Sequence, residues 1–172
     1  MRLYLKILCI LFATNISFSL LLYSQENSLD SIKKLINPAD DNDKVTYYNA
    51  LSEEYLNQEN IQQSIEYGEK ALKLAKEKES IEDKAEAYYN IGNAYLLEES
   101  YEKASDYLDK AMKEFQELGN DKETGQVLIK LGEAHYSQGA FSQSKTFYKN
   151  SLDFIKASSG KKTLARVHNK LG

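Results

Sequence analysis

The sequence predicts an all-α fold, a right-handed α-solenoid of antiparallel helix pairs with about three and a half repeats. Three observations support this prediction. Small residues recur every 40 positions, and many other columns share that interval: Ser52, Gly92, Gly132 and Gly172. Apolar residues within one unit follow helical spacing. The 172 residues include one proline and eight glycines, a composition that suits helices. A fixed period of about 20 to 50 residues is typical of stacked structural units.

The first element expected after the N-terminal leader is a capping helix with an acidic turn, over residues 25–43. Ser28 can cap a helix near 28–36. The apolar residues of this helix share one side: Leu29, Ile32, Leu35 and Ile36. Pro38 ends the helix, and the acidic residues that follow favour the N-terminus of the next one.

The repeat array is expected over residues 44–172. Its predicted helices lie near 43–57, 61–77, 81–97, 101–117, 122–138, 141–156 and 161–172. The helices form repeats near 45–78, 85–118 and 125–158, followed by a partial repeat at 164–172. Short links such as Glu98-Glu99-Ser100 force consecutive helices to be antiparallel.

One helix face explains the glycines of the period. Tyr88, Ile91, Gly92 and Tyr95 stand at positions i, i+3, i+4 and i+7 of a helix. Ala104, twelve residues after Gly92, is the small residue on the following helix. A mid-helix glycine costs about 1 kcal/mol relative to alanine, so its recurrence indicates a close crossing of two backbones.

This pattern resembles the tetratricopeptide repeat (TPR). The residues that carry the resemblance are Tyr88, Ile91, Gly92, Tyr95, Ala104, Tyr107, Leu108 and Ala111, with equivalents over roughly residues 45–172. The 40-residue period resembles the variant of the family with longer helices and a longer link. The resemblance implies a concave groove lined by the first helix of each pair, with a protein or peptide ligand in it.

The resemblance assigns the candidate groove by position, one turn away from the packed face. The candidate peptide-binding residues are Asn49, Glu53, Tyr89, Asn90, Asn93, Leu97, Ile129, Lys130, Glu133 and Tyr136. Asparagine amides can bond both N–H and C=O groups of an extended peptide. The alternative is that these residues merely reflect an asparagine-rich chain. TPR proteins that grip a C-terminal carboxylate use Lys, Asn and Arg across three repeats. Asn90 and Lys130 fit that set, whereas Asn49, Glu53 and Gln126 depart from it.

The N-terminus has the features of an export signal over residues 1–24. Arg2 and Lys6 flank a mainly apolar stretch, and the sequence turns polar after Ser24, where cleavage is expected. An uncleaved signal anchor is the alternative. Cys9, the one cysteine, lies within this leader, so a mature chain has no thiol. The expected location is the periplasmic or extracytoplasmic side of a membrane.

The N-terminal region carries a second resemblance, to the sensor region of TPR-containing histidine kinases from Bacteroidetes. The similar stretches are Leu-Asp-Ser-Ile-Lys-Lys-Leu at 29–35, the motif Asp-Lys-Val-x-x-x-Asn-x-Leu at 43–51 and the linker at 118–125. The resemblance implies an extracytoplasmic input region of a two-component-type receptor. The partial repeat at 164–172 suggests a fragment of a longer protein, with any kinase outside this chain. The alternative is a free-standing exported adaptor without signalling output.

Composition and motifs argue against other functions. A net charge of −4 without a basic cluster makes nucleic acid an unsuitable partner. His135 and His168 occupy columns held by tyrosine in other repeats, and no catalytic, phosphate-binding or metal-ligand spacing is present. We therefore expect no enzyme activity, cofactor or metal. Membrane association is expected only through an uncleaved leader or through a C-terminal part outside this chain.

Overall fold

A computed structural model describes residues 28–158 and 161–171. The chain divides into two units, Met1–Pro38 and Ala39–Gly172. The described part of the first unit is a helix at residues 28–36 followed by a turn at residues 37–38. The predicted leader lies outside the described residues. Within the described part, no helix has a stretch long and apolar enough to cross a membrane.

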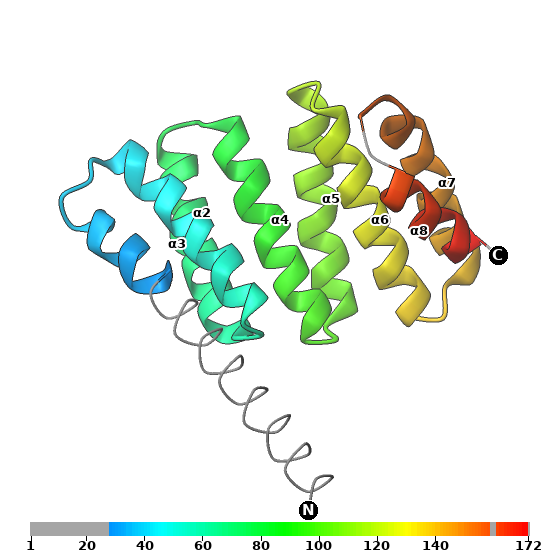
Figure 1. Ribbon diagram of the computed structural model, residues 1–172, viewed down its shortest axis with the longest axis horizontal. Helices are drawn as coiled ribbons and strands as arrows, with labels where there is room; N and C mark the ends of the chain where they lie inside the picture. Colours follow the sequence, from blue (N-terminus) through cyan, green and yellow to red (C-terminus); the bar gives the residue numbers. More distant parts are fainter. Residues whose placement is uncertain (1–27, 159–160, 172) are drawn as a thin grey trace, which may run out of the picture. The chain divides into compact units, whose positions relative to one another are not determined.

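The second unit is a succession of antiparallel helices (Figure 1). They are α2 (Asp41–Asn57), α3 (Ile61–Glu77), α4 (Ile81–Leu97), α5 (Tyr101–Glu117), α6 (Asp121–Ser137), α7 (Phe141–Ser158) and α8 (Lys161–Leu171). The first helices of the pairs begin 40 residues apart, at Asp41, Ile81 and Asp121. The described residues include no strand. The predicted solenoid of helix pairs is therefore confirmed, and the predicted helix bounds agree to within about two residues.

Each helix from α2 to α6 ends in the same type of turn. The second residue after each helix is left-handed, at 20-residue intervals: Glu59, Glu79, Glu99, Gly119 and Gly139, with φ between 56° and 78°. The next N–H bonds back five residues, as from Ser80 to the carbonyl of Ala75 at 3.0 Å. This Schellman pattern satisfies carbonyl groups that the helix end would leave free. Three linking residues therefore reverse the chain at every step.

Small residues let the two helices of a pair cross closely, as the glycine column predicted. A Cβ atom added to Gly92 would lie 2.8 Å from Leu108, and one added to Gly132 would lie 2.7 Å from the Tyr148 ring. In the first pair, Ser52 and Ser64 each donate a hydroxyl hydrogen bond to the other's carbonyl, at 2.7 and 2.8 Å. A large side chain at these crossings would cost about 1–3 kcal/mol through overpacking.

Stacked aromatic rings fill the space beside these crossings. Tyr67 of α3 lies against Tyr48 and Tyr55 of α2, at centroid distances of 6.0 and 5.4 Å. Tyr107 repeats this arrangement between Tyr88 and Tyr95 in the second pair. In the third pair His135 replaces a tyrosine and stacks on Phe147 at 5.0 Å. His135 is half-buried, so packing explains its presence in the column.

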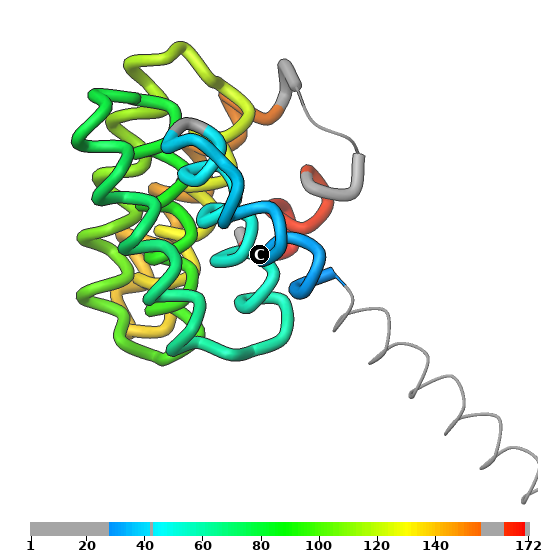
Figure 2. Tube along the Cα trace, turned by 90° about the vertical axis from the view of Figure 1, so that its left-hand side faces the viewer, coloured from blue at the N-terminus to red at the C-terminus, as the bar shows by residue number. Residues whose placement is uncertain are grey.

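Viewed from the α2–α3 end, successive helix pairs lie behind one another (Figure 2). Buried clusters connect neighbouring pairs along this stack. Val45, Leu72 and Ile91 belong to one cluster, and Leu108, Phe115, Val127 and Leu131 belong to the next. A third cluster joins Ile129 and Tyr148 to Val167 of α8. The first helices α2, α4 and α6 are thereby held in order along one side of the unit.

Candidate binding groove

A cleft of about 350 Å³ lies where α2, α4 and α6 follow one another. It is lined by Thr46, Asn49, Ala50 and Glu53 of α2, Glu86, Tyr89 and Asn90 of α4, Phe115 of α5, and Lys122, Glu123 and Gln126 of α6. Its volume is at the lower end of the range for ligand pockets, about 300–1,000 Å³. A cleft of this kind can receive one or two side chains of an extended segment.

Two asparagines in the cleft tie α2 to α4. The Asn90 Nδ2 group donates to the backbone carbonyl of Asn49 at 3.2 Å. The Asn49 Nδ2 group donates in return to the Asp83 carbonyl and to Glu86 Oε2, both at 3.4 Å. Both asparagines are buried, with 4% and 8% of their surfaces exposed. These Nδ2 groups therefore serve the contact between repeats.

The charged side chains of the cleft are mainly acidic. Lys122 is the one cation among the lining residues, and its Nζ bonds to Glu123 Oε1 at 2.8 Å. Glu53 and Glu86 have no ion pair within the described part of the chain. Burial raises the pKa of Glu86, and the neighbouring carboxylates of Asp83, Glu82 and Glu53 raise it further. The cleft is a region of negative potential.

Four of the predicted groove residues line this cleft: Asn49, Glu53, Tyr89 and Asn90. Asn93 is buried in α4, and its Oδ1 atom has no hydrogen-bond partner in the described structure. Lys130 and Glu133 form an ion pair at 3.1 Å on α6. Leu97 and Tyr136 are about half exposed, near the ends of their helices. None of these five residues lines the cleft.

Ile129 does not fit the predicted groove. Only 1% of its surface is exposed, because it packs with Tyr148, Ile155 and Val167. Its assignment came from the column that contains Asn49 and Tyr89, which both face the cleft. Val167 belongs to α8, so the next helix of the stack covers this position in the third repeat. A ligand cannot contact Ile129 without displacing that helix.

One column of cleft residues was not predicted from the sequence. Thr46, Glu86 and Gln126 stand 40 residues apart, one turn before the predicted positions. Lys122 and Glu123 come from the first turn of α6. The 40-residue period could have identified this column, since all three members are polar and stand at equivalent positions of α2, α4 and α6. The cleft therefore extends about one helical turn toward the N-terminus of each first helix, beyond the predicted groove residues.

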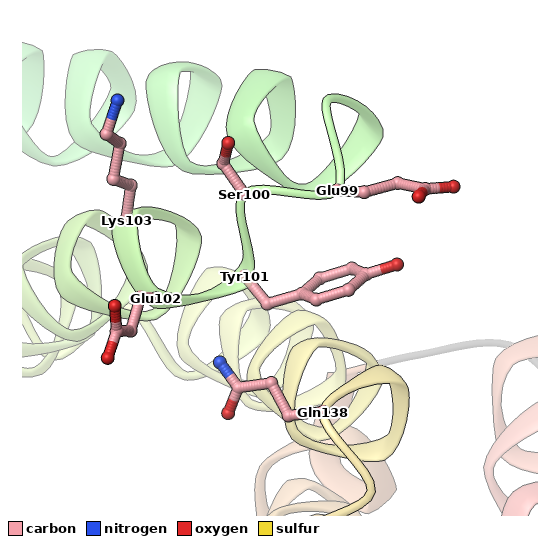
Figure 3. A pocket seen from close by; sticks show the side chains of 6 residues that line it. All are labelled: Glu99, Ser100, Tyr101, Glu102, Lys103 and Gln138. Atoms are coloured by element: carbon pink, nitrogen blue, oxygen red, sulfur yellow. The ribbon is translucent and has the colours of Figure 1, made fainter.

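A second hollow, of about 480 Å³, lies at the edge formed by the α4–α5 turn and the end of α6. Figure 3 shows that its side chains diverge: Glu99 points outward, Lys103 and Glu102 point to opposite sides, and Gln138 lies beside Tyr101. These groups do not converge on a common point. Across the described residues, no group of three His, Cys, Asp or Glu side chains could hold a metal ion.

Comparison with known protein families identifies the repeat. Two family models, each described as tetratricopeptide repeat, match residues 45–78 and 83–157. The chain belongs to the TPR proteins. The matched segments together cover well over half of the 172 residues, and they contain α2 to α7 almost entirely. Among curated proteins there is no significant match.

Solved structures with the same fold include other TPR proteins. The TPR domain of Arabidopsis FLU matches with a TM-score of 0.65 and 12% identity, over 69% of this chain and 100% of that one. Aspartyl phosphate phosphatase F from Bacillus subtilis matches with a TM-score of 0.77 and 15% identity, over 86% of this chain and 40% of that one.

A third structure is the Rap protein complexed with competence and sporulation factor. It matches with a TM-score of 0.69 and 17% identity, over 78% of this chain and 40% of that one. The TPR chain therefore spans less than half the length of the last two proteins. Identities this low show the shared fold and leave the function to be argued from the cleft.

Proposed function

We propose that this chain is a non-catalytic TPR scaffold that binds a peptide or protein segment in the cleft between α2, α4 and α6. The observation that carries the proposal is the cleft itself. Consecutive first helices line it, and a preformed floor of buried Asn49, Asn90 and Phe115 supports it. A preformed site reduces the ordering cost of binding. The Rap structure, solved with competence and sporulation factor, is a TPR-like neighbour with a bound partner.

A cleft-filling variant tests this proposal. Ala50 lines the cleft and is partly exposed, so Ala50→Trp places a bulky ring in it without entering the core. Gln62→Trp, on the exposed surface of α3, is the matched control. Both variants should keep the melting temperature of the parent chain. A partner that binds the parent and Gln62→Trp should lose binding to Ala50→Trp.

The outcome that contradicts the proposal is equally specific. Retained affinity in Ala50→Trp, with crosslinks on the second helices α3, α5 and α7, would place the partner outside the cleft. Crosslinking from a photoreactive amino acid at position 46, in the cleft, provides the direct readout.

The sequence also supports a proposal for the biological setting of this chain. We infer an extracytoplasmic input region of a two-component-type receptor, with a free-standing exported adaptor as the alternative. The leader-like residues 1–24 and the resemblance of residues 29–51 to receptor sensor regions support this setting. N-terminal sequencing of the protein from a fractionated host tests export, since cleavage after Ser24 leaves Gln25 first. Retention of the intact N-terminus in the cytoplasm would contradict it.

A further inference from the structure

The charge balance of the cleft indicates which kind of side chain it suits. Three carboxylates and one ammonium group line it, and the ammonium group of Lys122 is already bonded to Glu123. Glu53 of α2 and Glu86 of α4 remain without a cation among the described residues. Glu82 and Asp83, in the first turn of α4, add negative charge close to Glu86. A cation in the cleft would relieve this repulsion.

A second feature points to a hydrogen-bond donor. Asn49 lines the cleft with only 4% of its surface exposed, and its Oδ1 atom has no partner in the described structure. A buried acceptor without a donor is unfavourable, so a donor from a ligand would be stabilising. Both bonds from its Nδ2 are 3.4 Å long, beyond the usual range of about 2.7–3.2 Å. The amide is therefore held by long bonds only, and its Oδ1 is an acceptor without a donor in a residue that lines the cleft.

An aromatic ring completes the arrangement. Tyr89 lines the cleft beside Glu86 and Asn90. Lysine ammonium groups lie over Tyr67, Tyr88, Tyr95, Tyr107 and Tyr136 in the described structure, but over Tyr89 there is none. A guanidinium or ammonium group over an aromatic ring is attracted by the ring's negative face. Tyr89 is half-buried and packs on the cluster that contains Phe115, and no described lysine competes with a ligand cation for its ring.

We propose that the cleft recognises an arginine or lysine side chain of a bound peptide segment, held between Glu53 and Glu86 with Asn49 and Tyr89 beside it. Arginine fits best because its planar guanidinium carries five N–H donors and stacks on aromatic rings. This inference rests on the proposed function, since it names the class of ligand for the same cleft. The acidic lining of this cleft is opposite in charge to the clamp that holds a C-terminal carboxylate in some TPR proteins.

Selection from a random peptide display library, with the 172-residue chain as bait, tests the inference. Peptides that bind the parent chain and lose binding to Ala50→Trp are those held in the cleft. We expect these peptides to share an arginine or lysine at one position. The variant Glu53→Gln/Glu86→Gln removes two carboxylates without changing shape, and it should weaken such a peptide at least about tenfold. The control Glu69→Gln/Glu117→Gln removes two carboxylates of similar exposure that lie on α3 and α5, outside the cleft, and it should change affinity less than about twofold.

A second binding measurement uses the selected peptide with its arginine replaced by glutamine. The loss of affinity from Glu53→Gln/Glu86→Gln should largely disappear with this peptide, because the interacting charge is gone. Cleft-bound peptides that are acidic or neutral would overturn the inference and leave the proposed function standing. Arginine peptides that bind the glutamine variant as tightly as the parent would also overturn it. If every selected peptide still binds Ala50→Trp, the proposed function itself fails, and the inference fails with it.

Discussion

At the scale of single residues, the two buried asparagines of α4 have different surroundings. Asn90 and Asn93 are equally exposed, at 8%. Asn90 donates to the Asn49 carbonyl on α2, whereas the Oδ1 of Asn93 has no partner in the described structure. Both were predicted as ligand contacts because of their spacing, and spacing alone could not separate them. The distinction depends on which atoms of α2 lie opposite each amide.

This difference predicts losses of stability of different size for two alanine variants. Asn90→Ala should lower the free energy of unfolding by about 1 kcal/mol, because it removes a buried hydrogen bond between repeats. Asn93→Ala should change it less, because an unpartnered oxygen is removed as well. Urea unfolding of both variants measures the difference. Equal losses would show that the Asn90 bond contributes nothing specific to the contact between α2 and α4.

Tyr148 predicts a pH dependence at the alkaline end. Its ring is 1% exposed against Gly132, and burial raises the pKa of its hydroxyl to about 12. The unfolded chain releases this proton near pH 10, while the folded chain holds it, so folding stability is lost as the pH rises from about 10 to 12. Tyr148→Phe should show a smaller fall in melting temperature over that window. An identical fall in both proteins would mean that the other tyrosines account for it.

At the scale of elements, the turns repeat with one backbone conformation and two residue types. The left-handed position is glutamate after α2, α3 and α4, and glycine after α5 and α6. A residue with a Cβ atom is strained there by roughly 1–2 kcal/mol, whereas glycine is not. A Cβ atom added at Gly119 would meet nothing within 4 Å, so space is not the constraint. The helix ends are therefore fixed by the hydrogen-bond pattern of the turn, at a local cost where glutamate stands.

An exchange of residue types between equivalent turns tests this reading. Glu79→Gly should raise the free energy of unfolding by about 0.5–1 kcal/mol, and Gly119→Ala should lower it by about 1 kcal/mol. Lys73→Gly, at an exposed site inside α3, should instead be destabilising, since glycine is unfavourable within a helix. Thermal and urea unfolding of the three variants give the comparison. A loss in Glu79→Gly would indicate that its side chain stabilises the turn.

The helices could be predicted from the sequence because every column repeats under the same local rules. Helix spacing, small residues at crossings and three-residue links are all local signals, and they located each helix to within about two residues. The groove depends on the phase between neighbouring helices, which no single helix determines. Glu86 lines the cleft although it was not predicted, because the cleft extends one turn earlier along α4. Ile129 is buried because α8 covers this position in the third repeat.

The last helix, α8, is expected to be the least protected element of the array. It packs mainly on α7, and Val167 is its buried residue among the side chains described. Seven residues of α4 are buried, by comparison. Val167→Ala should speed amide exchange in α8 while leaving α4 unchanged, because solenoid elements interact mainly with their neighbours. Val127→Ala, a fully buried site in α6, should instead cost about 2 kcal/mol of global stability. Slow exchange throughout α8 in the parent chain would contradict this ranking.

At the scale of the whole molecule, the array is held together by similar contacts between neighbouring helices. The helix starts recur every 20 residues from Asp41 to Phe141. The same crossing of a small residue against its partner helix occurs at Ser52, Gly92 and Gly132. In such a linear architecture, stability is approximately the sum of repeat and interface terms. Keeping the 40-residue spacing between equivalent helices should therefore matter more for stability than the number of residues in the chain.

This property predicts that a larger deletion is tolerated better than a smaller one. Removing residues 81–120 takes out α4 and α5 together and joins Ser80 directly to Asp121, so α3 meets α6 in the place of α4. Leu131 then takes the position of Ile91 above Gly68, with a similar apolar volume. This variant should unfold cooperatively in urea, with a smaller m-value because less surface is buried.

Removing residues 101–120 deletes α5 alone and leaves the faces of α4 and α6 without the second helix between them. That variant should lose more stability despite the shorter deletion, since Gly92 no longer has Leu108 to pack against. Non-cooperative unfolding of the 40-residue deletion would show that the repeats are not interchangeable units, and the stability of this chain would then depend on contacts particular to each interface.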